Sequence, residues 1–383
     1  GPAMKKLCAL ALCLALCVGL LPSAAWAAGP EVKAKAVLLM EKSTGEILYE
    51  EHGEEPLELA SVTKVMTMLL IMEALEDGTL TPDTMVAVSA NAAGMGGSQV
   101  YMKEGETFSV HDMLKAIAVA SGNDACVAMA EHLAGSEAAF VERMNARAAE
   151  LGMENTVFCN CTGLPAEGHH STAHDIALMS RELILKHPDI RTYTTIWMDT
   201  LRDGSFQLAN TNKLIRFYDG ATGLKTGSTD GALYCISATA EKDGMELIAV
   251  VLGSPTSADR FEAAKALLNY GFAGYSLVTA APSEPLSPIP VTLGVAESVQ
   301  PVLSEPAQLL LPKADAAKLT TTVSLPDTLQ APVEAGQQLG TLTVLVNNEP
   351  FQTLPLTAQE PVPRLTLWQV FQGMVGMLCG NPA

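Results

Sequence analysis

Residues 58–75, ELASVTKVMTMLLIMEAL, are predicted to form an apolar helix with a serine and a lysine near its N-terminal end. The spacing of three residues places Ser61 and Lys64 on one face of that helix. A lysine beside a buried face is costly unless it is paired or has lost its proton. A neutral lysine can activate a serine, which is a weak nucleophile at its ordinary pKa. The pair therefore fits acyl transfer, although this short motif alone more often marks a helix-capping serine followed by a surface lysine.

Two further motifs follow in an order that favours the catalytic interpretation. The sequence S-G-N at residues 121–123 comes directly after a second predicted apolar helix, residues 109–120. The sequence K-T-G at residues 225–227 begins a predicted edge strand. The order S-x-x-K, S-x-N, K-T-G is typical of penicillin-binding proteins and serine β-lactamases. Three motifs in this order make an accidental match improbable.

The resemblance becomes more specific when longer segments are compared. The matching segments are ASVTKVMTMLLIMEAL, GMGGSQVYMKEGE, AVASGNDACVAMAEHLAGSE, NARAAELGMENTVF, EGHHSTAHDIALMSREL, NTNKLI and GLKTGSTDGALYCISATA. The chain resembles the low-molecular-mass penicillin-binding proteins that act as D-alanyl-D-alanine carboxypeptidases, peptidase family S11, and most closely their branch from Gram-positive spore formers. The resemblance covers about residues 32–275. Leu59 and Cys161 stand where the family often has proline, which affects local loop shape and no reacting group.

The resemblance implies a role for each residue of the first two motifs. Ser61 would attack the carbonyl of the penultimate D-alanine and form an acyl-enzyme, and Lys64 would accept its proton. Ser121 would relay that proton to the leaving amine. Asn123 would help to hold Lys64 and the substrate amide. Water would then hydrolyse the acyl-enzyme.

The third motif would bind the substrate. Lys225 and Thr226 would hold the terminal D-alanine carboxylate, or the carboxylate of a β-lactam, and the charge of Lys225 would help to keep the catalytic lysine neutral. Gly227 would leave room for the substrate backbone beside the strand. The backbone N–H groups of Ser61 and Ser228 would form the oxyanion hole. The expected ligands are peptidoglycan stem peptides ending in D-Ala-D-Ala and β-lactams as covalent inhibitors, with no cofactor and no metal.

Three other functions remain to be separated from this one. A serine β-lactamase shares all three motifs, but no E-x-x-L-N segment of the class A enzymes lies between Asn123 and Lys225. A zinc-dependent peptidoglycan peptidase would need ligands such as His170 and His174, which lie four residues apart. A capping residue between these two histidines favours a loop near the site over a zinc ligand pair. A non-enzymatic scaffold is disfavoured by the complete set of motifs.

The N-terminal residues are typical of a secretory signal. Met4 follows three residues that are taken as a cloning remnant, and two lysines, an apolar run and small residues come next. Ala25 and Ala27 fit the cleavage rule, so residues 1–27 are predicted to be removed and the protein to be secreted to the outer face of the cytoplasmic membrane. The net charge of −19 becomes −21 after that removal, because two lysines and no acids are lost. So acidic a chain is a poor partner for nucleic acid.

The remaining chain is predicted to form an α+β serine β-lactamase/transpeptidase-like domain, residues 28–276, with strands from both its ends in one helix-covered sheet. A small all-β domain over 277–358 follows, with a hairpin turn at Asn347-Asn348. The tail, residues 359–383, is predicted to form an amphipathic helix that contacts the membrane. Its apolar stripe consists of Leu367, Trp368, Phe371, Met374, Val375 and Leu378. Packing of this stripe on protein is the alternative.

Overall fold

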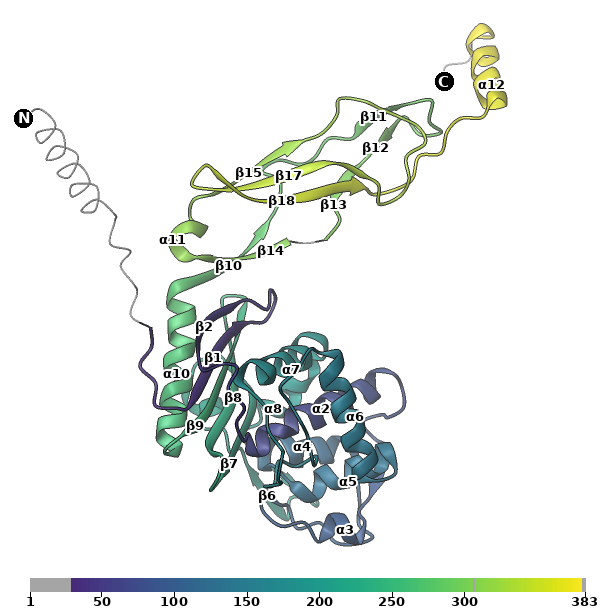
Figure 1. Cartoon of the computed structure of the whole chain (residues 1–383). Coiled ribbons are helices and arrows are strands. Elements are labelled where there is room, and N and C mark those ends of the chain that lie inside the picture. The colour runs from purple at the N-terminus through teal and green to yellow at the C-terminus, as the bar shows by residue number, and fades with distance from the viewer. Residues whose placement is uncertain (1–28, 306, 381–383) are drawn as a thin grey trace, which may run out of the picture. The chain divides into compact units, whose positions relative to one another are not determined.

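The catalytic motifs lie on an antiparallel sheet and the helices beside it (Figure 1). The computed structural model describes residues 29–305 and 307–380, so the predicted signal, residues 1–27, lies outside the described residues. The strand order is β2-β1-β9-β8-β7. The strands are β1 (Ala36–Glu41), β2 (Ile47–Glu51), β7 (Ala221–Thr229), β8 (Leu233–Lys242) and β9 (Met245–Ser254). Two early strands and three late strands thus share one sheet, which confirms the predicted α+β fold.

Both faces of the sheet are buried at strands β1 and β9, as their continuous apolar sequences require. Side chains alternate between the faces. Val37 and Leu39 pack in one apolar cluster with residues of α10 (Ser257–Gly274). Leu38 and Met40 pack in the other cluster, with residues of the helices that carry the first two motifs. The sheet therefore separates α10, with the short helix at Leu214, from the helices that carry the first two motifs.

The helices predicted over residues 58–75 and 109–120 are confirmed with small shifts at their ends. The helices that precede β7 are α2 (Lys64–Glu76), α3 (Ala90–Ala93), α4 (Val110–Ala120), α5 (Asn123–Ala134), α6 (Glu137–Glu150), α7 (Ala173–Lys186), α8 (Arg191–Thr194) and α9 (Leu214–Phe217). Ser109 caps α4, since its side chain accepts a hydrogen bond from Asp112 N. The first turn of the predicted helix at Ser61 is a 3-10 turn, η1 (Ala60–Thr63), and a second such turn is η2 (Pro188–Ile190).

The third motif departs from its predicted place within its strand. The residues 225–227 lie in the middle of β7, not at its beginning. The strand starts earlier because Ala221–Leu224 already pair with β8. The prediction that this strand lies at the edge is confirmed, because β7 pairs with β8 alone within the sheet. Two short antiparallel strand pairs, β3 (Met85–Ala87) with β4 (Thr107–Ser109) and β5 (Met198–Leu201) with β6 (Phe206–Ala209), complete the domain.

The chain after α10 forms short sheets with their own apolar clusters. The strands are β10 (Tyr275–Ala280), β11 (Ile289–Thr292), β12 (Ser298–Val299), β13 (Pro301–Leu303), β14 (Ala307–Pro312), β15 (Leu319–Ser324), β16 (Leu329–Gln330), β17 (Gln338–Val346) and β18 (Glu349–Ala358), with the single-turn helix α11 (Lys313–Ala316). β17 and β18 form the predicted hairpin. Asn347 and Asn348 both adopt positive φ, as a tight hairpin turn requires.

The last described element is helix α12 (Leu367–Leu378). Thr366 and Gln369 form a capping box at its start. None of its residues is buried. Over residues 29–305 and 307–380, no helix is both long enough and apolar enough to cross a membrane.

Candidate active site

The first motif brings a hydroxyl and an amine into contact. Ser61 lies in η1, and Lys64 is the first residue of α2. Lys64 Nζ lies 2.9 Å from Ser61 Oγ and donates to the carbonyl of Thr162 at 2.8 Å. The lysine is fully buried. Among the described residues, no carboxylate forms an ion pair with it, so nothing holds this amine in its charged form by direct pairing.

The turn that carries Ser61 is packed against backbone on two sides. A Cβ at Gly163 would lie 1.9 Å from Ala60 O, and one at Gly227 would lie 2.5 Å from Ser61 N. Real Cβ atoms do not come this close to backbone, so both positions require glycine. The turn of Ser61 alone therefore requires a glycine at position 227, and the predicted room for the substrate backbone stays a prediction.

The second motif follows a break between two helices. Ser121 ends α4 at φ 59°, a left-handed conformation that is uncommon for serine. Its hydroxyl is buried and has no hydrogen-bond partner in the described chain. Asn123 donates from Nδ2 to Gly96 O at 2.8 Å, and its buried Oδ1 has no partner among the described residues. The structure therefore shows neither residue bonded to Lys64, but it leaves two unpaired polar atoms for a ligand.

The third motif is more buried than its predicted role suggests. Lys225 is 1% exposed and its Nζ donates to Thr226 O at 2.9 Å. Thr226 Oγ1 lies 2.6 Å from Thr211 Oγ1. Ser228, by contrast, is exposed. The motif thus places a buried amine and a buried hydroxyl beside the first motif, and only the following residue, Ser228, is exposed.

The two lysines influence each other. Burial lowers the pKa of Lys64. Burial also lowers the pKa of Lys225 well below its usual value, and the charge of Lys64 lowers it further. Two like charges in one dry space are unfavourable. The site therefore favours a state in which one of these amines has given up its proton.

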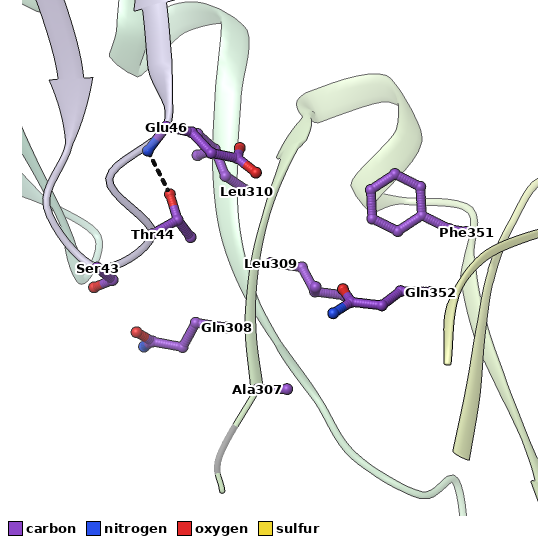
Figure 2. Close-up of a pocket in the computed structure, with 9 residues that line it drawn as sticks. All are labelled: Ser43, Thr44, Glu46, Ala307, Gln308, Leu309, Leu310, Phe351 and Gln352. Carbon is purple, nitrogen blue, oxygen red and sulfur yellow. Dashed lines mark hydrogen bonds between the residues drawn. The ribbon is translucent and has the colours of Figure 1, made fainter. Parts of the chain in front are cut away.

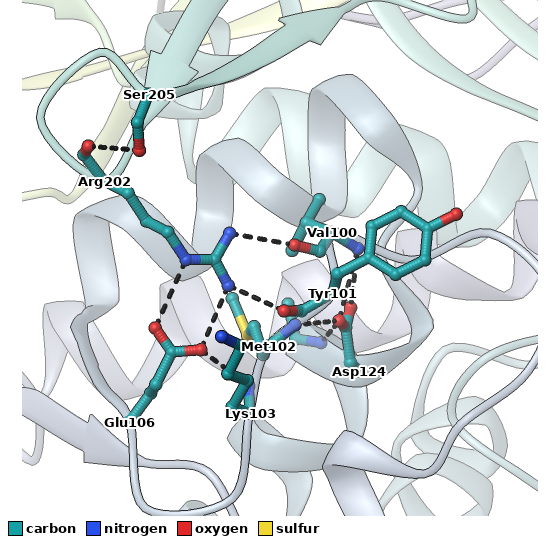
Figure 3. A network of polar contacts seen from close by, with 9 residues as sticks. Val100, Tyr101, Met102, Lys103, Glu106, Asp124, Arg202 and Ser205 are labelled. Carbon is teal, nitrogen blue, oxygen red and sulfur yellow. Dashed lines mark hydrogen bonds and ion pairs between the residues drawn. The ribbon is translucent and has the colours of Figure 1, made fainter.

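A polar network that the sequence did not reveal fixes the loop next to Asn123 (Figure 3). Asp124 accepts hydrogen bonds from the backbone N–H groups of Val100 and Met102. Arg202 donates to the carbonyls of Val100 and Tyr101 and pairs with Glu106 at 3.1 Å. Because Gly96 in the same loop accepts from Asn123, this network fixes one wall of the site. Arg202 lies 102 residues from Val100 along the chain, so no local sequence pattern predicts its part in this network.

Arg260 is a second residue that the sequence interpretation missed. It lies on α10, and its buried guanidinium donates to Gly227 O and Cys235 O. Its Nε has no partner among the described residues. The guanidinium therefore adds positive charge behind β7 and lowers the pKa of Lys225. No motif surrounds Arg260, so only the packing of α10 on the sheet could reveal it.

The residues proposed as zinc ligands do not form a site. His170 precedes α7, and its Nδ1 hydrogen-bonds with Gly168 O at 2.8 Å. His174 lies in the first turn of α7 and pairs with Glu54 at 3.2 Å. In the described part of the chain, no three His, Cys, Asp or Glu side chains are grouped to hold a metal ion.

A separate pocket lies away from this chemistry (Figure 2). Its lining includes Thr44, Glu46, Gln308 and Phe351, and contains no residue of the three motifs. Within it, Glu46 N donates to Thr44 Oγ1 at 3.2 Å. Because none of the three motifs contributes to its lining, we assign no catalytic role to this pocket.

The fold and the three motifs define a penicillin-binding class of acyl-transfer protein, and comparisons with known proteins specify the family. The model of D-alanyl-D-alanine carboxypeptidase, peptidase S11, matches residues 23–256. The model of the C-terminal domain of penicillin-binding protein 5 matches residues 280–364. The chain belongs to the D-alanyl-D-alanine carboxypeptidase family, and it is a hydrolase with penicillin-binding relatives.

Individual relatives agree with this assignment. The D-alanyl-D-alanine carboxypeptidase DacF of Bacillus subtilis is 42% identical over 337 residues, which cover 87% of this chain and 86% of that protein. DacC of Escherichia coli is 34% identical over 342 residues, with 87% and 85% covered. The crystal structure of penicillin-binding protein 5 from Haemophilus influenzae superposes with a TM-score of 0.77 at 28% identity, and covers 88% of this chain and 99% of that one.

Proposed function

We propose that the protein is a serine-type D-Ala-D-Ala carboxypeptidase in which Ser61 is the nucleophile. The contact of 2.9 Å between Ser61 Oγ and the buried Nζ of Lys64 carries this proposal. Burial favours the neutral amine, which can take the serine proton as the hydroxyl attacks the carbonyl of the penultimate D-alanine. The bond to Thr162 O keeps the amine aimed at the hydroxyl. The C–N bond then breaks, and terminal D-alanine leaves.

The other motif residues act on the substrate in this proposal. The free hydroxyl of Ser121 passes a proton to the leaving amine, and the unpaired Oδ1 of Asn123 accepts from the substrate amide. The backbone N–H groups of Ser61 and Ser228 stabilise the oxyanion. Thr226 reads the terminal carboxylate, and Lys225 supplies positive charge from behind it. Water finally hydrolyses the ester and restores the serine.

A release assay tests this function against its rivals. The full chain is incubated with a peptide ending in L-Lys-D-Ala-D-Ala, and free D-alanine is measured with and without penicillin or EDTA. The proposal expects D-alanine release that penicillin abolishes and EDTA leaves intact. Loss of activity in EDTA would favour a zinc enzyme. Rapid multiple turnover of nitrocefin would favour a β-lactamase.

We also propose that the protein works on the outer face of the cytoplasmic membrane and contacts it through α12. Two features support this proposal: the predicted signal at residues 1–27, and a helix of 12 residues without a charged side chain and without buried residues. A helix of this length reaches only about 18 Å, so it would lie in the interface instead of crossing the bilayer. The stacked rings of Trp368 and Phe371, whose centroids lie 5.6 Å apart, would enter the headgroup region.

A further inference from the structure

The loop of residues 159–164, whose backbone contacts Lys64, is itself hydrogen-bonded to helix α2. Thr162, whose carbonyl accepts from Lys64, belongs to the loop of residues 159–164. Thr67 of α2 donates to Cys161 O at 2.7 Å. Gly163 packs against the backbone at Ala60. The position of the lysine amine therefore depends on how firmly this loop is held against η1 and α2.

The buried side chain of His169 forms a further hydrogen-bonded link between this loop and η1. Its Nδ1 accepts a hydrogen bond from Cys159 N at 2.8 Å. Its Nε2 lies 2.7 Å from Oγ1 of Thr63, the last residue of η1, which directly precedes Lys64. One imidazole thus links the start of the loop to the end of the nucleophile's turn.

The chemistry of these two contacts determines the form of the ring. A backbone N–H can only donate, so Nδ1 must carry no proton. The proton must then reside on Nε2, from which it is donated to the Thr63 hydroxyl. A charged imidazolium would place a second N–H against that of Cys159 and break the link. The contacts therefore require a neutral ring.

The surroundings agree with this requirement. Among the described residues, no carboxylate bonds either ring nitrogen; the nearby titratable groups are Lys64 beyond Thr63, the thiol of Cys159 and the neighbouring His170. Burial and, to a smaller extent, the adjacent His170 lower the pKa of His169 from 6.5 to about 4. The ring therefore stays neutral at ordinary pH.

We propose that His169 is a positioning residue for acylation. Its ring links the loop of residues 159–164 to η1, which carries Ser61. The link keeps the Thr162 carbonyl in the position from which it orients Lys64. This inference rests on the proposed function of Ser61 and Lys64. It assigns His169 no contact with substrate. Its effect should appear in the rate of ester formation and not in the affinity of the encounter complex.

The main test measures acylation by benzylpenicillin in stopped flow, with the acylation rate constant separated from the binding constant. In His169→Leu both bonds are lost, and acylation should slow by roughly 100-fold, as small misplacements of reacting groups do, with binding unchanged. In His169→Gln a neutral amide presents one acceptor and one donor at similar positions, and the rate should stay within about threefold of wild type. His170→Leu is the matched control and should acylate normally.

Thr63→Val removes the hydroxyl that bonds His169 Nε2. This second variant keeps the proposal testable if His169→Leu does not fold. Acylation should again slow. The double variant Thr63→Val/His169→Leu should acylate only slightly more slowly than either single variant, because both substitutions remove the same link. An unchanged rate in Thr63→Val and His169→Leu, or a His169→Gln variant as slow as His169→Leu, would overturn the proposal. If wild type itself takes up no penicillin, the proposed function fails first.

A pH series of melting temperatures tests the neutral ring independently. In the unfolded chain His169 takes up a proton near pH 6.5, and the folded protein resists this down to about pH 4. Wild type should therefore lose stability relative to His169→Gln as pH falls from 8 to 5.5, by roughly 2 °C. A difference that does not change with pH would show that the fold does not hold this ring neutral.

Discussion

Helices α2 and α12 break the usual rule of burial in opposite directions. α2 buries a lysine whose side chain is 0% exposed, while α12 exposes apolar residues such as Leu367 at 91%. The partners of Lys64 are within the chain, namely the Ser61 hydroxyl and the Thr162 carbonyl. The described chain shows no side chain covering α12. A buried polar group and an exposed apolar face are both informative exceptions, and here one indicates chemistry inside the protein and the other a contact outside it.

The largest expected effect concerns the buried amine. Lys64→Arg keeps the positive charge but cannot give up its proton near neutral pH. Acylation by penicillin should fall by about a thousandfold or more, because nucleophile and base act as a unit. The exposed Lys103 provides a matched control, and Lys103→Arg should acylate normally. An arginine variant that acylates within about tenfold of wild type would show that the proton leaves by another route.

The next effect separates the two buried lysines. Lys225→Ala should reduce turnover of peptides with a free terminal carboxylate by roughly 10- to 100-fold, and spare those whose carboxylate is amidated. Turnover of both peptide types is measured, with the exposed Lys213→Ala as control. Equal losses for both peptides would mean that Lys225 acts only through the charge state of Lys64, which its full burial also permits.

The sequence predicted the parts of this site that are encoded in short contiguous motifs. The spacing of Ser61 and Lys64 gave their contact, because three residues on a helix fix neighbouring side chains. It could not predict Thr162, whose contribution is a carbonyl that any residue carries. It also could not predict Arg260 or His169, which reach the site only through packing between distant segments. The edge strand was predicted, but its start was misplaced because pairing with β8 extends it towards Ala221.

A smaller effect tests the tight packing around the turn of Ser61. Gly163→Ala combines positive φ, 87°, with a Cβ that would overlap Ala60 O. Gly152 has φ 76° and open space around it, so Gly152→Ala carries the backbone cost without the overlap. Urea unfolding should show a loss of about 1 kcal/mol for Gly152→Ala and about 3 kcal/mol or more for Gly163→Ala. Acylation should slow in Gly163→Ala and not in Gly152→Ala. Equal losses of stability in the two variants would contradict the packing argument.

The weakest expected effect concerns α12. Full-length protein should sediment with liposomes, while a truncation after Gln359 should stay in the supernatant. Trp368→Ser with Phe371→Ser should reduce binding, and Gln372→Ser should leave it unchanged. Binding should be moderate, because the helix carries no basic residue and the chain is acidic. Binding that survives truncation, or no binding by either form, would sink the membrane proposal and favour contact with protein.

Intact-mass analysis after addition of penicillin shows whether Ser61 is the residue that is acylated. Peptide mapping then locates the adduct. The structure predicts one covalent equivalent per chain on Ser61, and none in a folded Ser61→Ala variant. An adduct on Ser121, on Ser228 or on a cysteine such as Cys126 would contradict the assignment of the nucleophile.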